Sequence, residues 1–509
     1  MIRYRLLACL GLVAFAASAV AGKETTRESS TPESLRRFTL RQAIETAFQR
    51  NPDILRARQE IRRTKGIEIQ VLSQAVPQLT ADAVFTRTDS ELTNNGRSGG
   101  GSAPTPTIAP SPTPAGTPGS SGSGSVVLSD NSYNLRFTAS QLLYNGTVIP
   151  AIRGAGAARD ASFFALRDTI DRVVATVRQQ FYLVILNKAL IGVQEESVQL
   201  LESQLKDQEN RFEAGTVPRF NVLQADVALA NQQPALITAR NNLRIAQIQL
   251  TRTIGLDFDP KRGDKDKPPL ECIGELSFQE RAIPLTAAIE LGKERRPLLK
   301  QQRSNILNQV QQVGVAFGGF QPSVSLNGGY EYRSNPFSDR LRDVAEGYFI
   351  GVTGSWAIFD GFLTAGRVKE ARATLSQAKI SYDDAVRQVE LEIQQAYSNL
   401  QQDRELYFSQ SKNVDQAREA LRLASARLGV GAGVQLDVLN AQLALTQAQS
   451  TRLSALSAYN TDLAEFDRAT ATDTIYHDTF DDPLTRRSKE TRMIKTTTTE
   501  ARESKPSGK

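Results

Sequence analysis

Two fifteen-residue stretches decide the fold: RFEAGTVPRFNVLQA at residues 211–225 and RLGVGAGVQLDVLNA at residues 427–441. They match at a shift of 216 residues, and each holds a glycine-containing turn followed by an apolar-periodic segment. Glycine just past a helical pattern favours a left-handed helix end. We therefore expect two helical hairpins, with turns at 213–218 and 429–433, in a chain that carries one unit twice. The turn residues are Gly215, Thr216, Val217 and Pro218 in the first hairpin and Gly429, Val430, Gly431, Ala432 and Gly433 in the second.

The segments before both turns are predicted to be very long helices. Residues 367–428 contain neither Gly nor Pro over 62 residues, which would span ~93 Å as one helix. Apolar residues recur at every seventh position, which indicates supercoiling against neighbouring helices. Return helices are expected at about 219–254 and 434–470. The heptad residues are Phe163, Ile170, Val177, Val184, Ile191, Val198, Leu205 and Phe212 in the first unit, and Val386, Ile393, Leu400, Tyr407, Val414, Leu421 and Leu428 in the second.

The repeat extends towards the start of each unit. FTLRQAIETAFQRNPDIL begins at Phe38 and IPLTAAIELGKERRPLLK at Ile283, a shift of 245 residues. The segments QLLYNG (141–146) and WAIFDG (356–361) match at a shift of only 215, so the first unit has gained 30 residues between these points. The gain holds RSGGGSAPTPTIAPSPTPAGTPGSSGSGS (97–125), which is too poor in large apolar side chains to form a core. We predict a disordered loop there, acting as a passive spacer in preference to a receptor or adhesion segment.

Strand patterns flank this loop and its counterpart in the second unit. Leu79, Ala81, Ala83 and Phe85 alternate with Thr80, Asp82, Val84 and Thr86, and the returning arm carries Leu135, Phe137, Ala139, Gln141 and Leu143 at every second position. In the second unit the same period of two covers 324–332 and 348–358. This alternation predicts one hairpin of two strands per unit. Because an isolated hairpin is marginally stable, we expect these four strands to close a sheet with other copies of the chain.

The N-terminus reads as an export signal. Arg3 and Arg5 precede a 15-residue apolar run, and Ala19 and Ala21 give a small-x-small cleavage pattern. Signal cleavage is favoured over a membrane anchor because the run is short for a span. Cys9 gives a lipobox-like pattern, but most of the apolar run follows it, so lipidation is the weaker alternative.

Composition excludes several classes of function. The formal net charge of +6 comes from the signal, which carries +2, and from residues 484–509, where eight Lys or Arg and three Glu give +5, which leaves −1 for residues 22–483. This balance argues against a nucleic-acid partner. The mature chain keeps one cysteine, Cys272, and one histidine, His477, so we expect no disulfide, no His- or Cys-based metal site and no such nucleophile. No apolar run after Ala21 is long enough for a transmembrane helix.

The predicted organisation follows from these features. It is mainly α with a small β part, arranged as a signal peptide (1–21), a linker (22–37), a first repeat (38–255), a connector or equatorial segment (256–282), a second repeat (283–470) with its long helix at 361–428, and a polar tail (471–509). Residues 257–271, which are charged and contain Pro, read as a solvated connector.

The chain resembles the outer-membrane efflux protein, or TolC-like, family. The matching features are the openings LRQAIETAFQRNP and LTAAIELGKERRP, the junction FDGFLTAGRVKEARATLSQAK, and the segments ending NVLQA and DVLNA. The resemblance covers roughly residues 38–470. It implies a homotrimer with a 12-stranded barrel in the Gram-negative outer membrane and a long helical barrel through the periplasm. It also implies a duct without cofactor, whose partners are outer-membrane lipid, a periplasmic adaptor and, through that adaptor, an inner-membrane transporter. The 97–125 loop would then lie outside the cell.

The resemblance also assigns candidate site residues. The two turns would form the periplasmic tip and meet the adaptor, although their glycines are also explained by turn geometry alone. Asp437 matches a position where the family places an acidic ring around the aperture, and its alternative is a solvated carboxylate favoured near a helix start. Asn440 stands where a second acid is common, and Asn221 replaces Asp in the first unit. We therefore expect a weak acidic ring and modest cation preference.

Two other classes of protein compete with the duct. An exported coiled-coil stalk or adhesin would explain the heptads and the Ser/Thr/Pro-rich stretch, but not the duplicated hairpins or helices that turn back. An enzyme is disfavoured because the carboxylates lie on long helical faces, where a solvated role is the default.

Overall fold

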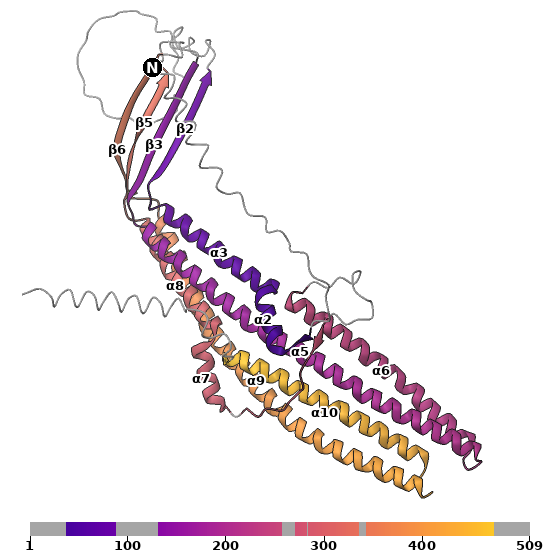
Figure 1. Cartoon of the computed structure of the whole chain (residues 1–509). Coiled ribbons are helices and arrows are strands. Elements are labelled where there is room, and N and C mark those ends of the chain that lie inside the picture. Colours follow the sequence, from indigo (N-terminus) through magenta and orange to yellow (C-terminus); the bar gives the residue numbers. More distant parts are fainter. Residues whose placement is uncertain (1–36, 88–130, 257–269, 282, 335–342, 473–509) are drawn as a thin grey trace, which may run out of the picture.

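The computed structural model describes residues 37–87, 131–256, 270–281, 283–334 and 343–472 (Figure 1). The predicted signal, most of the linker, the 97–125 insertion and the tail beyond residue 472 lie outside these described residues, as do Cys9 and His477. The chain is mostly helical with a small sheet part, as the sequence predicts.

The described elements repeat in the same order. The first unit contains α2 (Leu40–Arg50), α3 (Pro52–Ser73), β2 (Gln78–Arg87), β3 (Asn131–Asn145), α5 (Val148–Glu213) and α6 (Arg219–Ile254). The second contains α7 (Leu285–Arg295), α8 (Pro297–Gly318), β5 (Ser323–Ser334), β6 (Val344–Ser355), α9 (Leu363–Gly429) and α10 (Gln435–Thr470).

The opening segment of each unit is two helices, whereas the sequence predicted one. Pro52 and Pro297 stand at the first position of α3 and α8, where a missing N–H costs nothing. Inside a continuous helix the same prolines would remove a hydrogen bond and clash with the preceding turn. The chain therefore ends one helix and begins another at each proline.

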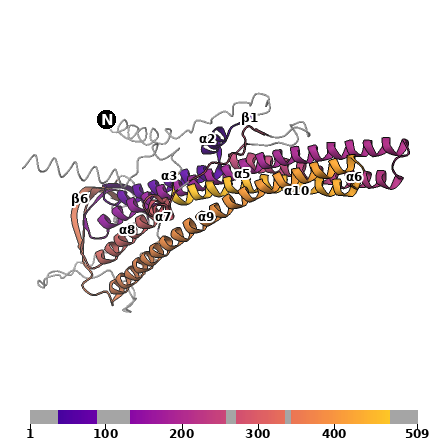
Figure 2. The same ribbon diagram turned by 90° about the horizontal axis from the view of Figure 1, so that it is seen from below.

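The long helices α5 and α9 have 66 and 67 residues. They organise a layer in which α3 packs on α5, α5 on α8, and α8 on α9. Beyond this layer α5 pairs with α6, and α9 with α10. The sheet lies at one end of the molecule and both helical turns lie at the other, and Figure 2 shows α9 curving along this length (Figures 1 and 2).

Heptad residues supply much of the core. Ile170, Val177 and Val184 of α5 are buried against α2, α3 and the end of α6, and Ile393 and Leu400 of α9 are buried against α7, α8 and α10. Val414 continues this seam towards the turns. Phe212, the last member of the first series, is exposed and stands one residue before the end of α5, beside the turn.

The four long strands form one antiparallel sheet in the order β2-β3-β5-β6. The register aligns Ala81, Phe137, Tyr330 and Tyr348 in one row across all four strands. Side chains of directly paired residues lie on the same face, so this face is apolar. Every described residue of β2 is exposed, so the single chain leaves the apolar face uncovered.

Two predictions of detail are wrong. The period of two extended to Ile358, but β6 ends at Ser355, and Trp356 instead donates its indole N–H to the carbonyl of Phe320 at 3.0 Å. The connector 257–271 was predicted to be solvated; its residues 257–269 lie outside the described residues, but the prediction is wrong at its described end, where Leu270 is buried in the first core, as is the adjoining Cys272. They are held there because β4 (Glu271–Cys272) pairs in parallel with β1 (Arg37–Phe38).

Candidate functional site

The two helical turns have the same hydrogen bonds. In the first, Gly215 N donates to Phe212 O at 2.9 Å and Thr216 N to Arg211 O at 2.9 Å. In the second, Gly431 N donates to Leu428 O at 3.1 Å and Ala432 N to Arg427 O at 2.9 Å. Both are Schellman ends, in which the two crossed bonds satisfy carbonyls that a helix end otherwise leaves free.

The glycines of these turns serve different purposes. Gly215 and Gly431 have φ of 69° and 76°, the left-handed region where a side chain is disfavoured. Gly429 is the last residue of α9 and has no special backbone requirement. At Gly433 the chain passes close to its own helix, since an added Cβ would lie 3.1 Å from the Cβ of Arg427.

Both turns lie at the same end of the molecule (Figure 1). Polar side chains join the two hairpins just behind them. Gln208 of α5 donates to Gln435 of α10 at 3.2 Å, and both are buried. Deeper in, Thr446 donates to Ser197 at 3.2 Å. This seam of polar residues is not among the features predicted from the sequence. Its signal in the sequence is an amide side chain at every seventh position of α10, at Gln435, Gln442 and Gln449. This spacing is the register of a core stripe.

The predicted aperture residues occupy equivalent places on the return helices. Asp437 N donates to Val434 O and Asn221 N to Pro218 O, so both stand in the first turn of their helix. Asp437 and Asn440 are exposed, and Asn221 is half-buried. A carboxylate at the first turn of α10 is favoured by the helix dipole whatever else it does. One chain contributes a single Asp437 to this end of the molecule, so a ring of these carboxylates requires further copies of the chain.

Exposed apolar side chains surround the turns. Val430 is 79% exposed, and Phe220, Val434 and Leu436 are also exposed large apolar residues. Exposed apolar side chains gathered in this way are common at protein interaction sites.

A second polar cluster lies where the helices α7, α8, α9 and α10 meet. Arg296, 3% exposed, donates to Glu392 at 2.7 Å, and Arg468 reaches the same carboxylate at 3.2 Å. Burial would raise the pKa of Glu392, but the two guanidinium groups outweigh it and hold the pKa below its ordinary value of 4.5. Asp467 binds Arg178 of α5 and Arg281 of the connector, which fastens the two units together.

Two carboxyl groups face each other between α9 and α10. Burial, together with the neighbouring Asp403 carboxylate and Glu465, raises the pKa of Asp462 from its ordinary value of 3.8 to about 6. Burial also raises the pKa of Asp403, although its hydrogen bond with Asp462 opposes that shift. This pair takes up a proton in mildly acid solution.

Aromatic residues gather where the sheet meets the helices. Phe320, Trp356, Phe359 and Phe362 are all exposed. The rings of Phe359 and Phe362 contact edge-to-face at 5.6 Å between centroids. Exposed aromatic side chains in a band beside an apolar sheet face are typical of a membrane–water interface.

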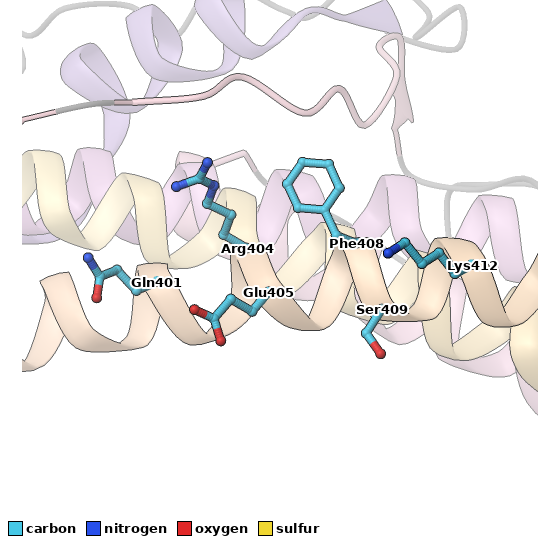
Figure 3. A pocket seen from close by; sticks show the side chains of 6 residues that line it. All are labelled: Gln401, Arg404, Glu405, Phe408, Ser409 and Lys412. Carbon is cyan, nitrogen blue, oxygen red and sulfur yellow. The ribbon is translucent and has the colours of Figure 1, made fainter.

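A pocket of about 580 Å³ lies along α9 (Figure 3). Arg404, one of its lining residues, pairs with Glu280 at 2.5 Å, and the ring of Phe408 packs edge-on against Phe278. All the lining residues come from one helix, so the pocket is an open groove, and we assign it no ligand. They are Gln401, Arg404, Glu405, Phe408, Ser409 and Lys412.

The described residues lack a clustered metal site and a membrane-spanning helix. Within them, no group of three or more His, Cys, Asp and Glu side chains is placed to hold a metal ion. None of the helices described is both long enough and apolar enough to cross a membrane.

Solved structures of outer-membrane channels share this fold. The CmeC outer membrane channel of Campylobacter jejuni superposes with a TM-score of 0.71 at 16% identity, covering 88% of each chain. The outer membrane protein VceC of Vibrio cholerae gives a TM-score of 0.66 at 18% identity over 85% of this chain and 95% of that one. The open state of the MtrE channel of Neisseria gonorrhoeae gives 0.65 at 19% identity, over 89% and 95%.

Curated relatives match more locally. Protein CyaE of Bordetella pertussis is 26% identical over 193 residues, 38% of this chain and 39% of that protein. Outer membrane protein TolC of Escherichia coli is 24% identical over 271 residues, 50% of this chain and 52% of that protein. The matches thus span about half the length of these relatives or less.

The family described as outer membrane efflux protein, in contrast, matches residues 43–256 and 288–472, most of both repeats. The chain therefore belongs to the outer membrane efflux protein family.

Proposed function

We propose that the chain is one third of a trimeric duct that carries solutes from a periplasmic adaptor and an inner-membrane pump across the periplasm and the outer membrane. The observation that carries this proposal is that the helix layer and the sheet each have two open edges. The helix layer ends at α3 on one side and α9 on the other, and the sheet ends at β2 and β6. Each edge strand has a row of backbone groups ready to pair with another copy.

Closure by three copies would satisfy every open edge. β6 of one chain would pair with β2 of the next, giving twelve strands, and α9 would pack on the neighbour's α3. The apolar row of Ala81, Phe137, Tyr330 and Tyr348 would then face outer-membrane lipid, with the aromatic band at its periplasmic border. The helices α5 and α9, of 66 and 67 residues, would each reach ~100 Å into the periplasm.

The two turns would form the tip of the duct. The exposed Val430 and Phe220 would contact helices of the adaptor, and three copies of Asp437 would line the aperture. With Asn at positions 440 and 221, this ring would give modest cation preference. The insertion at 97–125 joins two strands at the far end of the sheet from the helices, so it would lie outside the cell. There a long loop costs little, because closure entropy rises slowly with length.

Reconstitution tests the duct directly. The purified full-length chain should form a detergent-solubilised particle with the protein mass of three subunits, and this particle should open stable pores in a planar bilayer. A monomer of 55.8 kDa without conductance would overturn the proposal.

Docking of the adaptor is tested separately by a substitution at the tip. Val430→Asp adds a charge to a side chain that packs little within the chain, so pore conductance should persist while cross-linking to the adaptor in cells is lost. Ala432→Ser, at the same turn, is the matched control and should retain cross-linking. Equal cross-linking by both variants would place the docking surface elsewhere.

A further inference from the structure

The face of the sheet opposite the apolar row carries a line of charges. The register pairs Asp82 with Arg136, and Arg136 with Glu331, so three charged side chains stand in one row across β2, β3 and β5. Directly paired residues share a face, and this row alternates with the apolar one. We call Asp82, Arg136 and Glu331 the charge row.

Arg136 is held in place by an aromatic ring. Its guanidinium carbon lies 4.3 Å from the centroid of Phe349, a cation–π distance. Phe349 is paired with Gly329, where an added Cβ would meet Phe349 ring atoms at 2.9 Å and the Phe137 carbonyl oxygen at 2.0 Å. The missing side chain of Gly329 therefore lets the ring lie across β5 towards Arg136 on β3.

The charges of the row are not neutralised by one another. In the part of the chain that the structure describes, Arg136 forms no ion pair with a carboxylate, and its guanidinium lies against the ring of Phe349 instead. Glu331 accepts a hydrogen bond from the amide of Asn134 at 3.0 Å, which fixes the carboxylate on this face. Asp82 is exposed. Each chain thus presents two carboxylates and one positioned guanidinium, with Arg333 two residues further along β5.

We propose that the charge row determines ion specificity inside the outer-membrane span, as a second selective band distant from the periplasmic tip. This inference rests on the proposed trimeric duct, in which the polar face of the sheet lines the lumen. Three copies place six carboxylates and three guanidinium groups in one ring. Fixed charges in a lumen with low-dielectric walls focus the field that a passing ion meets. Arg136 offsets part of the negative charge of the ring, and it keeps the pore permeable to small anions and anionic solutes.

The test is the permeability ratio of K⁺ to Cl⁻, taken from the reversal potential of the purified trimer in a planar bilayer under a KCl gradient. Arg136→Gln leaves Asp82 and Glu331 without the cation of their own row and should raise the ratio about threefold or more, because fixed charge focused in the lumen raises the local cation concentration. Glu331→Gln should lower it. Arg136→Lys keeps the charge and should stay near wild type, so the two Arg136 variants separate charge from damage to the fold.

Glu346 supplies a matched control on the neighbouring strand. It pairs with Tyr332 in the adjacent row, which lies on the apolar face. Glu346→Gln removes the same charge as Glu331→Gln and should leave the ratio unchanged. Raising KCl from 0.1 M to 1 M shortens the Debye length from about 10 to about 3 Å, so the differences between variants should shrink.

The outcomes separate this inference from the function beneath it. Conducting pores whose ratio is the same in wild type, Arg136→Gln and Glu331→Gln would overturn the charge row and leave the duct intact. Equal shifts in Glu331→Gln and Glu346→Gln would overturn the assignment of faces and, with it, the row. A wild-type chain that forms no pore would overturn both proposals.

Discussion

Each repeat contains a joint that ties the start of its second helix to the end of its return helix, and the two joints differ in chemistry. In the first, Asn51 precedes α3 and donates its side-chain amide to Thr253 O at 2.7 Å. In the second, Arg296 precedes α8 and donates to Ala469 O at 3.1 Å. The positions correspond at the same shifts, 245 and 216 residues, that relate the rest of the repeats.

The difference lies in what else each side chain does. Asn51 also accepts from Asp53 N and Ile54 N, so one neutral amide caps α3 and holds the return helix. Arg296 has no acceptor and leaves α8 without a side-chain cap, but it binds Glu392 at 2.7 Å. The duplicated unit therefore preserves the place of the contact, while one joint is neutral and the other depends on buried charge.

Substituting the two joint residues should give the largest difference in loss of stability between the repeats. Arg296→Met leaves the Glu392 carboxylate with Arg468 alone and should lower the free energy of unfolding by about 3–5 kcal/mol. Asn51→Ala removes a cap and a carbonyl partner and should cost about 1–3 kcal/mol. Urea denaturation of the detergent-solubilised protein measures both. Equal losses would mean that the charged network adds nothing over the neutral amide.

Substitutions at the helix ends beside the two joints should change the free energy of unfolding in opposite directions. Gly255 and Ala471 both end a return helix with positive φ, 79° and 50°. An added Cβ at Gly255 would lie 2.3 Å from Arg50 O, so Gly255→Ala should destabilise by about 2–4 kcal/mol, combining left-handed strain with a clash. Ala471→Gly relieves strain and should stabilise by up to about 1 kcal/mol. Thermal unfolding of the two variants would contradict this account if both moved in the same direction.

Acid should stabilise the second repeat through Asp462, whose pKa is raised from its ordinary value of 3.8 to about 6. Between these values the folded state binds more protons than the unfolded state, so stability falls as pH rises through this range. Asp462→Asn should flatten the dependence and raise stability at pH 7 by on the order of 1–2 kcal/mol, since solvent screens part of the shift. The first unit has Asn187 and Ala246 at the equivalent positions and should contribute none of this dependence.

Protonation of Asp462 can be distinguished from that of Glu392 by its pH window. The pKa of Glu392 lies below 4.5, so its contribution is complete above that pH and is lost as the pH falls further. Unfolding midpoints measured from pH 4 to pH 8 separate the two. A midpoint that rises with pH between 5 and 7 would contradict the assignment to Asp462.

Substitutions in the two tip turns should lower the free energy of unfolding by equal amounts, and by less than the substitutions above. An added Cβ at Gly215 or Gly431 meets nothing within 4 Å, so only the left-handed backbone is penalised. Gly215→Ala and Gly431→Ala should each cost about 1 kcal/mol. Unfolding midpoints of the two variants that differ strongly would show that the turns are not equivalent.

The sequence predicts the helices, turns and strands well because each leaves a local signal. Glycine marks the turns at 215 and 431, the absence of Gly and Pro marks α9, and alternation marks the strands. What it misses depends on contacts between distant segments. The burial of Leu270 requires the β1–β4 pairing, and the Gln208–Gln435 contact requires the two hairpins to lie side by side. The predicted aperture at Asp437 depends on other copies of the chain and stays a prediction.

Cysteine labelling on intact cells tests the central claim, a duct that crosses the outer membrane. The native Cys272 is 3% exposed and burial raises the pKa of its thiol to about 12, so it should react slowly with maleimide. Cys272→Ala removes this remaining reactivity. In that background we predict that Ser111→Cys, in the insertion, reacts with a membrane-impermeant maleimide on intact cells. Ala432→Cys, at the tip, should react only after the outer membrane is breached. Labelling of both positions on intact cells would contradict the duct and place the helices outside the cell.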